Sequence, residues 1–113
     1  MLVDADMDEN FAMELIKQCP ANASASVTVS NDPVTASLFD NQYYQNLVDG
    51  KGLFRSDSVL FTDERTKGKV EGFSTNQDDF FAKWSESFVK LSSIGVKTGE
   101  QGEIRKSCMN VNG

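Results

Sequence analysis

The stretch SNDPVTASLFDNQYYQNLVDGKGLFRSD, residues 30–57, predicts a turn, a helix and a second turn in that order. Asp32, placed before Pro33, favours a turn. Asp40 is placed to cap the helix, and Gly50 is placed to end it. The apolar side of the helix consists of Tyr43, Tyr44, Leu47 and Val48. Apolar residues that recur at this spacing are typical of an α-helix rather than a strand.

The residues before this stretch predict one more helix. Its apolar side chains recur at positions i, i+4 and i+8, and they are Phe11, Leu15 and Cys19. We expect this helix to run from residue 8 to residue 19 and to end at Pro20. The polar tract over residues 21–32 predicts a loop, with a short extended piece at residues 27–29.

The strongest helical pattern is TNQDDFFAKWSESFVKLSSIG, residues 75–95. We expect Thr75 or Asn76 to cap this helix and Gly95 to end it. Its apolar stripe consists of Phe81, Trp84, Phe88 and Leu91, and it is widened by Phe80 and Val89. A stripe of this width predicts a helix that is covered on more than one side.

Two shorter helical segments are expected between residues 50 and 75. Residues 56–61 predict a helical turn, and a weaker helix follows Asp63. Gly68 and Gly72 weaken that helix because each costs about 1 kcal/mol relative to alanine. Alternation typical of strands is nearly absent from the chain. The sequence therefore predicts an all-α protein.

The composition of the chain limits the classes of partner that it is expected to bind. With 113 residues it is near the common size of one domain. Its net charge is -6, and its 11 basic residues are scattered among 17 acidic ones, which argues against nucleic acids and anionic membranes. The first ten residues show no secretory signal, and no segment has the roughly 18 apolar residues of a membrane span.

Two features point the other way, toward the secretory pathway. Asn22-Ala23-Ser24 is an N-glycosylation sequon, and Cys19 and Cys108 lie far apart, as structural cysteines do. Such triplets also occur by chance, and two cysteines do not distinguish free thiols from a disulfide. The compartment is therefore left open by these residues.

The chain contains no histidine, which excludes the Ser-His-Asp and Cys-His catalytic sets and zinc sites that use histidine. The oxygen-bearing side chains of Asp32, Thr35 and Asp40 allow two interpretations. They make a turn and a helix cap, or they bind a hard cation such as calcium, which takes about six to eight oxygen ligands. Their spacing leaves both interpretations open.

The same stretch also resembles a known family. DPVTASLFDNQYYQNLVDGKGLFRSDSVLF, residues 32–61, resembles the secretory plant (class III) heme peroxidases, in which D-x-x-T-x-x-x-FDN-x-YY-x-NL leads through KGL to SD-x-x-LF. TGEQGEIRKSC, residues 98–108, matches the family's ending, and DMDENFAMELIKQCP, residues 6–20, is similar to the family's helix before a Cys-Pro pair. The resemblance implies that residues 1–113 are the C-terminal third of the mainly α-helical plant heme peroxidase fold, a partial domain whose helices are joined by long loops.

The resemblance assigns roles to the oxygen ligands. It implies that the proximal calcium is bound by Asp32, the side chain and carbonyl of Thr35, the carbonyl of Leu38, and Asp40. The family's remaining calcium ligand is a threonine beside the proximal histidine, upstream of this chain. Asp57 matches the aspartate that accepts a hydrogen bond from that histidine. Its alternative role is to cap the short helical turn at residues 56–61.

The resemblance also implies that this chain holds no catalytic residue and no residue that binds heme. The family's proximal histidine, distal histidine and distal arginine lie upstream, as do the cysteines that pair with Cys19 and Cys108. A Cys19–Cys108 disulfide is therefore not expected. We expect the chain alone to be inactive and to expose apolar side chains such as Phe81, Trp84 or Phe88.

For the complete protein, the resemblance implies an enzyme that reduces hydrogen peroxide and oxidises phenolic donors in one-electron steps. Its cofactors are heme b and calcium, and it is a secreted monomer of the cell wall or vacuole. The alternative interpretation is a non-catalytic, calcium-binding helical module. An upstream exon with a signal peptide and an H-T-I/L-G segment favours the enzyme, and a start at Met1 favours the module.

Overall fold

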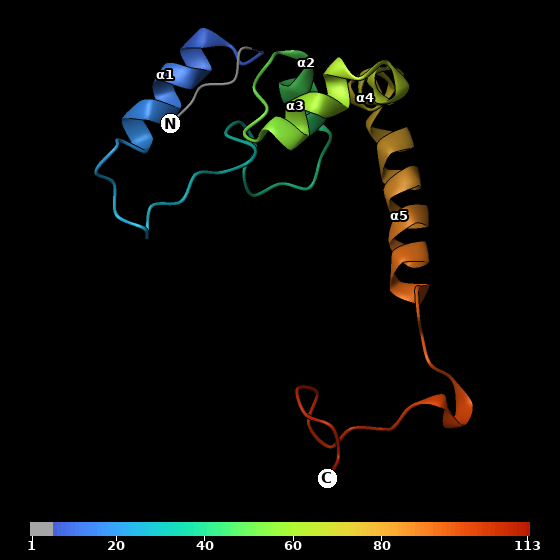
Figure 1. The fold of residues 1–113 in the computed structure, drawn as a ribbon. Coiled ribbons are helices and arrows are strands. Elements are labelled where there is room, and N and C mark those ends of the chain that lie inside the picture. The colour runs from blue at the N-terminus through green and yellow to red at the C-terminus, as the bar shows by residue number, and fades with distance from the viewer. Residues whose placement is uncertain (1–5) are drawn as a thin grey trace. The chain divides into compact units, whose positions relative to one another are not determined.

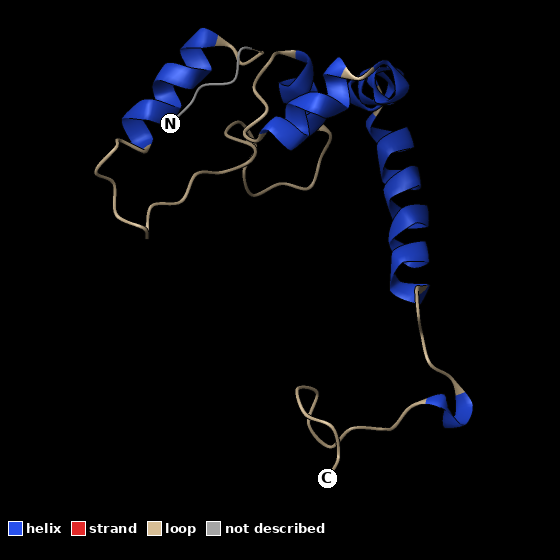
Figure 2. Ribbon diagram, viewed as in Figure 1, coloured by secondary structure: helices blue, strands red, loops and turns tan. Residues whose placement is uncertain are grey.

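The computed structural model describes residues 6–113, which form helices joined by long loops (Figures 1 and 2). The elements are α1 (Glu9–Gln18), α2 (Gln42–Val48), α3 (Arg55–Thr62), α4 (Glu64–Thr75), α5 (Gln77–Ser93) and the short 3-10 helix η1 (Gly99–Gln101). Within the described residues, β pairing is limited to one isolated bridge between Ser107 and Asn110. The all-α prediction is confirmed. The chain divides into two compact units after Phe81.

Helix α1 forms where the sequence predicts it. The Asp8 side chain caps it, because Oδ1 accepts a 2.9 Å hydrogen bond from the backbone N–H of Phe11. Phe11 and Leu15 are buried, and Cys19 is half-buried at the C-terminal cap. The extended piece expected at residues 27–29 does not form a strand.

Helices α2, α3 and α4 pack against one another (Figure 1). Leu47 of α2 and Val70 of α4 are buried in the core of this group. The buried side chain of Asn41, just before α2, donates hydrogen bonds to the carbonyls of Phe73 (2.8 Å) and Ser74 (3.0 Å) at the end of α4. The amide thus satisfies carbonyls that a helix end leaves without an intrahelical partner.

An aromatic cluster surrounds Phe80, which is 5 % exposed in the first turn of α5. The rings of Phe39, Tyr44, Phe73 and Phe81 lie at centroid distances of 5.4, 5.1, 6.0 and 5.6 Å from the Phe80 ring. Aromatic pairs at these distances and tilts stabilise a core beyond the area that they bury. The cluster therefore joins the loop before α2 to α4 and to the start of α5.

Helices α4 and α5 meet at a single residue. The backbone N–H of Asn76 donates to the carbonyl of Gly72 and closes α4, while its side-chain Oδ1 accepts a 3.0 Å hydrogen bond from the N–H of Asp79 in α5. The prediction that Thr75 or Asn76 caps the long helix is confirmed for Asn76. Gly95, with a φ of 66°, follows the end of α5 in the left-handed conformation typical of a helix C-cap.

Two predicted caps lie one or more residues from the observed ones. Asn41 rather than Asp40 is the N-cap of α2, although Oδ1 of Asp40 accepts a 3.0 Å hydrogen bond from the N–H of Gln42. Helix α3 begins earlier than expected, with Phe54 as its N-cap. Asp57 therefore lies inside the first turn, where its Oδ2 accepts from the N–H of Phe54 at 3.0 Å. Asp57 is not the N-cap residue, but the prediction that its side chain caps this short helix is confirmed, because it accepts from the N–H of Phe54 from the third helical position.

The remainder of α5 presents an apolar face to solvent. Trp84 is 47 % exposed and Phe88 is 57 % exposed, and Leu91 and Val89 are also exposed. The prediction that α5 is covered on more than one side is wrong for the described residues, because residues 82–113 contain no second α-helix that could cover it. The expectation that the chain exposes apolar side chains is confirmed for Trp84 and Phe88, whereas Phe81, which was named with them, is half-buried against Phe39 and Phe80. Among residues 6–113, no helix has the length and apolar character needed to cross a bilayer.

Candidate functional site

The loop before α2 is organised around the Asp32 carboxylate. Oδ1 accepts hydrogen bonds from the backbone N–H groups of Val34 (2.9 Å) and Thr35 (3.2 Å) and from the side-chain amide of Asn46 (3.0 Å). Oδ2 accepts from the hydroxyl of Thr35 at 2.6 Å. Burial raises the pKa of the Asp32 carboxyl, but these hydrogen bonds outweigh burial and hold its pKa below the usual 3.8. The group is an anion at neutral pH.

A second carboxylate meets the same hydroxyl. Thr35 Oγ1 lies 2.6 Å from Asp32 Oδ2 and 3.2 Å from Asp40 Oδ1, so two anionic groups converge on a hydroxyl that carries one hydrogen. Among the described residues, neither carboxylate forms an ion pair with lysine or arginine. The structure thus brings Asp32, Thr35 and Asp40 together, and residues 6–113 provide no basic side chain that pairs with the two carboxylates.

Leu38 belongs to the same loop. Its backbone N–H donates a 2.8 Å hydrogen bond to the carbonyl of Thr35, and its side chain is exposed. The Thr35 carbonyl therefore accepts one hydrogen bond and keeps a second lone pair for another partner. Nothing about the Leu38 carbonyl contradicts its assignment as a ligand, which stays a prediction.

The oxygen donors of this loop fit a hard cation in kind. Two carboxylates, one hydroxyl and nearby carbonyls are the ligand types that calcium prefers. No group of three or more His, Cys, Asp or Glu side chains gathers anywhere in residues 6–113. A calcium ion held by this loop would therefore depend on hydroxyl and carbonyl oxygens, and the five oxygens that the sequence assigns fall below the about six to eight that calcium takes.

The Asp57 carboxylate is the second functional group assigned from the sequence. Its Oδ1 accepts a 2.8 Å hydrogen bond from the phenol of Tyr43, which lies on α2. Burial, the hydrogen bond to Asp57 and the charge of Asp57 raise the pKa of Tyr43 above its ordinary 10.0, so the phenol remains a donor. A carboxylate has about four acceptor positions. Asp57 can therefore accept a further hydrogen bond.

Two residues of this region were missed by the sequence analysis, and both lie on α2. Asn46 is 1 % exposed and donates to Asp32, and Tyr43 donates to Asp57. The sequence assigned Tyr43 to the apolar side of the helix and gave Asn46 no role. A signal was present, because Asn46 lies three residues after Tyr43 and next to Leu47, and a polar residue on the buried side of a helix needs a hydrogen-bond partner.

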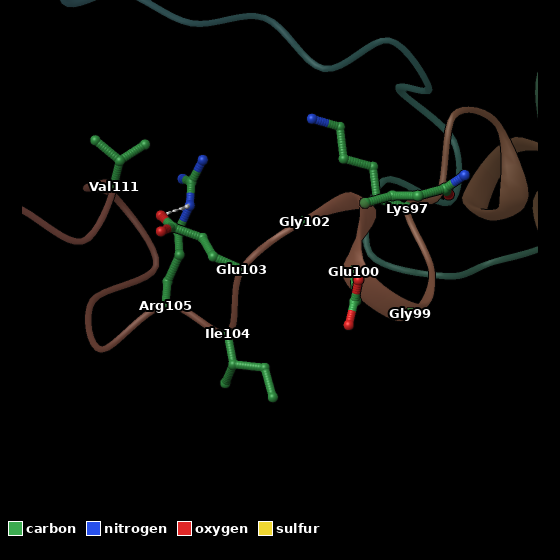
Figure 3. Close-up of a pocket in the computed structure, with 9 residues that line it drawn as sticks. Lys97, Gly99, Glu100, Gly102, Glu103, Ile104, Arg105 and Val111 are labelled. Carbon is green, nitrogen blue, oxygen red and sulfur yellow. Dashed lines mark ion pairs between the residues drawn. The ribbon is translucent and has the colours of Figure 1, made fainter.

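A separate hollow in the C-terminal residues carries no recognisable chemistry. It is lined by residues between Lys97 and Val111, and Figure 3 shows Glu103 and Arg105 paired within it while Ile104 points away from the pair. Ile104 is 96 % exposed. The lining includes none of the residues that the sequence assigns to calcium or to Asp57's site. The loop of residues 30–40 and Asp57 remain the candidate site.

Comparison with known proteins identifies the family. The sequence profile of the family described as Peroxidase matches residues 2–76, which include the loop of residues 30–40, α2 and Asp57. This chain belongs to the peroxidase family. The resemblance drawn from the sequence motifs is thereby confirmed, and the peroxidase family's mainly helical fold agrees with the helices observed here.

Three relatives from Arabidopsis thaliana extend the match over nearly the whole peroxidase chain. Peroxidase 46 is 52 % identical over 111 residues, which cover 98 % of this chain and 34 % of the relative. Peroxidase 18 is 49 % identical over 112 residues, with the same coverage of 98 % and 34 %. Peroxidase 50 is 44 % identical over 106 residues, which cover 94 % and 32 %. The chain spans about a third of the length of these curated peroxidases.

Both cysteines of the peroxidase chain are free thiols, Cys19 half-buried and Cys108 exposed. We expect alkylation without a reductant to label both residues in the 113-residue protein, because neither has a partner cysteine within the described residues. Mass spectrometry of peptides from the monomer measures the result. A fully denatured and reduced sample provides the control for complete labelling. A monomer in which both residues resist labelling until a reductant is added would contradict this prediction.

Proposed function

We propose that the complete protein is a heme peroxidase that reduces hydrogen peroxide and oxidises phenolic donors in one-electron steps. The observation that carries this proposal is the match of the peroxidase family over residues 2–76, with relatives that match nearly the whole chain. The same relatives support a secreted plant protein, and we propose that it acts as a monomer. Residues 1–113 are, in this proposal, the C-terminal part of the peroxidase domain.

The proposal gives this chain a supporting part in the chemistry. Heme, when bound, supplies the oxidising power drawn from peroxide. The chain contains no histidine, so the axial ligand and the base that accepts the peroxide proton come from residues outside these 113. What this chain contributes is a carboxylate, Asp57, and a set of oxygen ligands in the loop before α2.

We propose that Asp57 accepts a hydrogen bond from the heme-ligating histidine. Its Oδ1 is fixed by the phenol of Tyr43 and its Oδ2 by the N–H of Phe54, so the carboxylate has a defined orientation. A carboxylate that accepts from a metal-ligating imidazole fixes the ring and makes it a stronger electron donor. Asp57 is thus a positioning residue rather than a catalytic one.

We also propose that Asp32, Thr35, Leu38 and Asp40 bind calcium. Support comes from the two carboxylates that converge on the Thr35 hydroxyl without a basic partner among the described residues. A divalent cation neutralises this pair and accepts the oxygen donors that the loop offers. Water or a residue outside the loop completes the coordination.

A chimera tests the enzymatic proposal. In it, this chain replaces the segment of Peroxidase 46 to which 111 of its residues align. We expect the chimera to bind heme and to oxidise a phenolic donor with hydrogen peroxide. We expect Asp57→Ala in the chimera to lower kcat/KM by about tenfold to a hundredfold, because the histidine loses its hydrogen-bond acceptor. A change in the heme absorption spectrum provides a second measurement.

The matched control for this chimera is Asp49→Ala, which removes the same charge from an exposed residue paired with Lys51 at 3.3 Å. We expect Asp49→Ala to leave kcat/KM and the heme spectrum unchanged. A chimera that binds heme and shows no turnover would contradict the proposed function. An active chimera in which Asp57→Ala behaves like Asp49→Ala would contradict only the role of Asp57.

The second candidate function is a non-catalytic, calcium-binding helical module. The observation that favours it is the convergence of the Asp32 and Asp40 carboxylates on the Thr35 hydroxyl, because these oxygen donors suit a hard cation whether or not heme is bound elsewhere. Both candidates use the same loop for calcium, so calcium binding does not distinguish them. The activity of the chimera does distinguish them. A segment that serves only as a calcium-binding module is not expected to complete a working heme site when it replaces the corresponding part of Peroxidase 46.

A further inference from the structure

Asn46 is a polar residue buried within α2, and its side chain points toward Asp32 in the loop of residues 30–40. It is 1 % exposed, so each polar atom of its amide needs a protein partner. Nδ2 donates a 3.0 Å hydrogen bond to Asp32 Oδ1. Oδ1 accepts a 3.0 Å hydrogen bond from Nε2 of Gln42, one helical turn earlier on α2.

The bond from Gln42 sets which way the Asn46 amide faces. A side-chain amide has an acceptor oxygen and a donor nitrogen, and Gln42 presents a donor to the oxygen. The nitrogen is therefore turned toward Asp32. The opposite orientation would place the amide oxygen against the Asp32 carboxylate and the amide nitrogen against the donor of Gln42. For the same reason, the oxygen of Asn46 is turned away from the carboxylates and does not serve as a calcium ligand.

Asn46 differs from the other partners of Asp32 in where it is anchored. Val34 and Thr35 donate from the loop itself, two and three residues away, and move with it. Asn46 donates from a helix that is packed against α3 and α4, and that is 14 residues away in the chain. Asp32 accepts several hydrogen bonds in the described structure. Of these, the bond from Asn46 is the one that fixes the carboxylate relative to the packed helices α2, α3 and α4.

We propose that Asn46 is a positioning residue for the calcium site, which holds the Asp32 carboxylate in its ligating orientation from α2. This inference rests on the proposed calcium site and extends it to a residue that does not touch the ion. Helix α2 then anchors the loop at two points, because the N–H of Gln42 also donates to Asp40 Oδ1 at 3.0 Å. Hydrogen-bond partners that orient a metal ligand contribute strongly to metal affinity.

Calcium titration of the Peroxidase 46 chimera, which is the parent in this comparison, by isothermal titration calorimetry tests the proposal, because the resemblance places the remaining calcium ligand upstream of residues 1–113. Asn46→Leu replaces the buried amide with an apolar side chain that branches at the same position and removes both hydrogen bonds. We expect this variant to bind calcium chloride about tenfold more weakly than the parent. The matched control is Leu47→Val, which trims the neighbouring buried residue of α2 and removes none of the hydrogen bonds to Asp32. We expect Leu47→Val to unfold at a lower temperature and to keep the parent's Kd.

The control separates positioning from general stability. A residue with only a structural role would lower the unfolding temperature in calcium-free buffer and leave the Kd of the folded protein unchanged, as expected for Leu47→Val. If Asn46→Leu does not fold, Gln42→Leu removes the donor that orients the Asn46 amide and is expected to weaken calcium binding in the same direction. Parent-like calcium affinity in whichever of the two variants is measured overturns the role of Asn46. A parent that binds no calcium overturns the proposed site as well.

Discussion

Heme added to the 113-residue protein is expected to oxidise a phenolic donor with hydrogen peroxide no faster than free heme does. Peroxide cleavage needs an axial ligand on the iron and a base that moves the peroxide proton, and histidine is the usual residue for both. This chain contains none. Asp57 therefore has no imidazole to orient, and its contacts to Tyr43 and Phe54 support no catalytic group within the chain.

The exposed face of α5 shapes the outcome of this experiment. Trp84 and Phe88 stack at 6.3 Å and are about half exposed, so they offer heme an apolar surface without a ligand. We expect weak binding that does not saturate at one heme per chain. A heme titration followed by a donor assay measures both, and the active chimera is the positive control. One five-coordinate heme per chain, with turnover above that of free heme, would show that the catalytic groups are misassigned.

Calcium is expected to raise the unfolding temperature of the Peroxidase 46 chimera, and Asp32→Ala or Asp40→Ala is expected to abolish that rise. A ligand stabilises the state that binds it, by about 2.7 kcal/mol when its concentration is a hundred times the Kd. Removal of either carboxylate takes an anionic ligand from a site with few of them. Asp32→Ala also leaves the donors of Thr35 and Asn46 without their acceptor.

Thermal unfolding in calcium and in a chelator measures this effect. Asp49→Ala again supplies the matched control, since it removes an exposed carboxylate that lies outside the loop. We expect the control to keep the full calcium-dependent rise. An equal rise in Asp32→Ala and in the parent would end the assignment of Asp32 as a ligand. Asp32→Ala can also unfold at a lower temperature than the parent when both are measured in the chelator. That difference would reflect the lost hydrogen bonds and not the lost calcium ion.

Most of the helices could be predicted from the sequence because their signals are local. The spacing of Phe11 and Leu15 and the cap at Asp8 define α1, and Asn76 and Gly95 bound the long helix. Local signals of this kind could not predict which residues pack over the apolar stripe of α5. A wide apolar stripe shows that a helix has a surface to bury, but it does not show which residues cover that surface, and residues 82–113 do not.

The candidate site was predicted in part for a similar reason. Asp32, Thr35 and Asp40 lie within nine residues, so a single loop brings their oxygens together, and local spacing was sufficient to suggest it. Asn46 and Tyr43 reach their partners across 14 residues each, through the packing of α2. Contacts of that kind depend on the tertiary arrangement, and the only local sign of them was a polar residue on the buried side of the helix.

A single residue, Asn76, separates the end of α4 at Thr75 from the start of α5 at Gln77. Asn76 closes one helix with its backbone and opens the next with its side chain, so one residue performs two terminal roles. An insertion or a deletion at this position would disturb the end of α4 and the start of α5 together, and with them the position of Phe80 in the aromatic cluster. The loop at residues 20–31 has no such constraint, because its residues are nearly all exposed and lie outside the helices. Length variation and fusion points therefore belong in that loop and not at the junction.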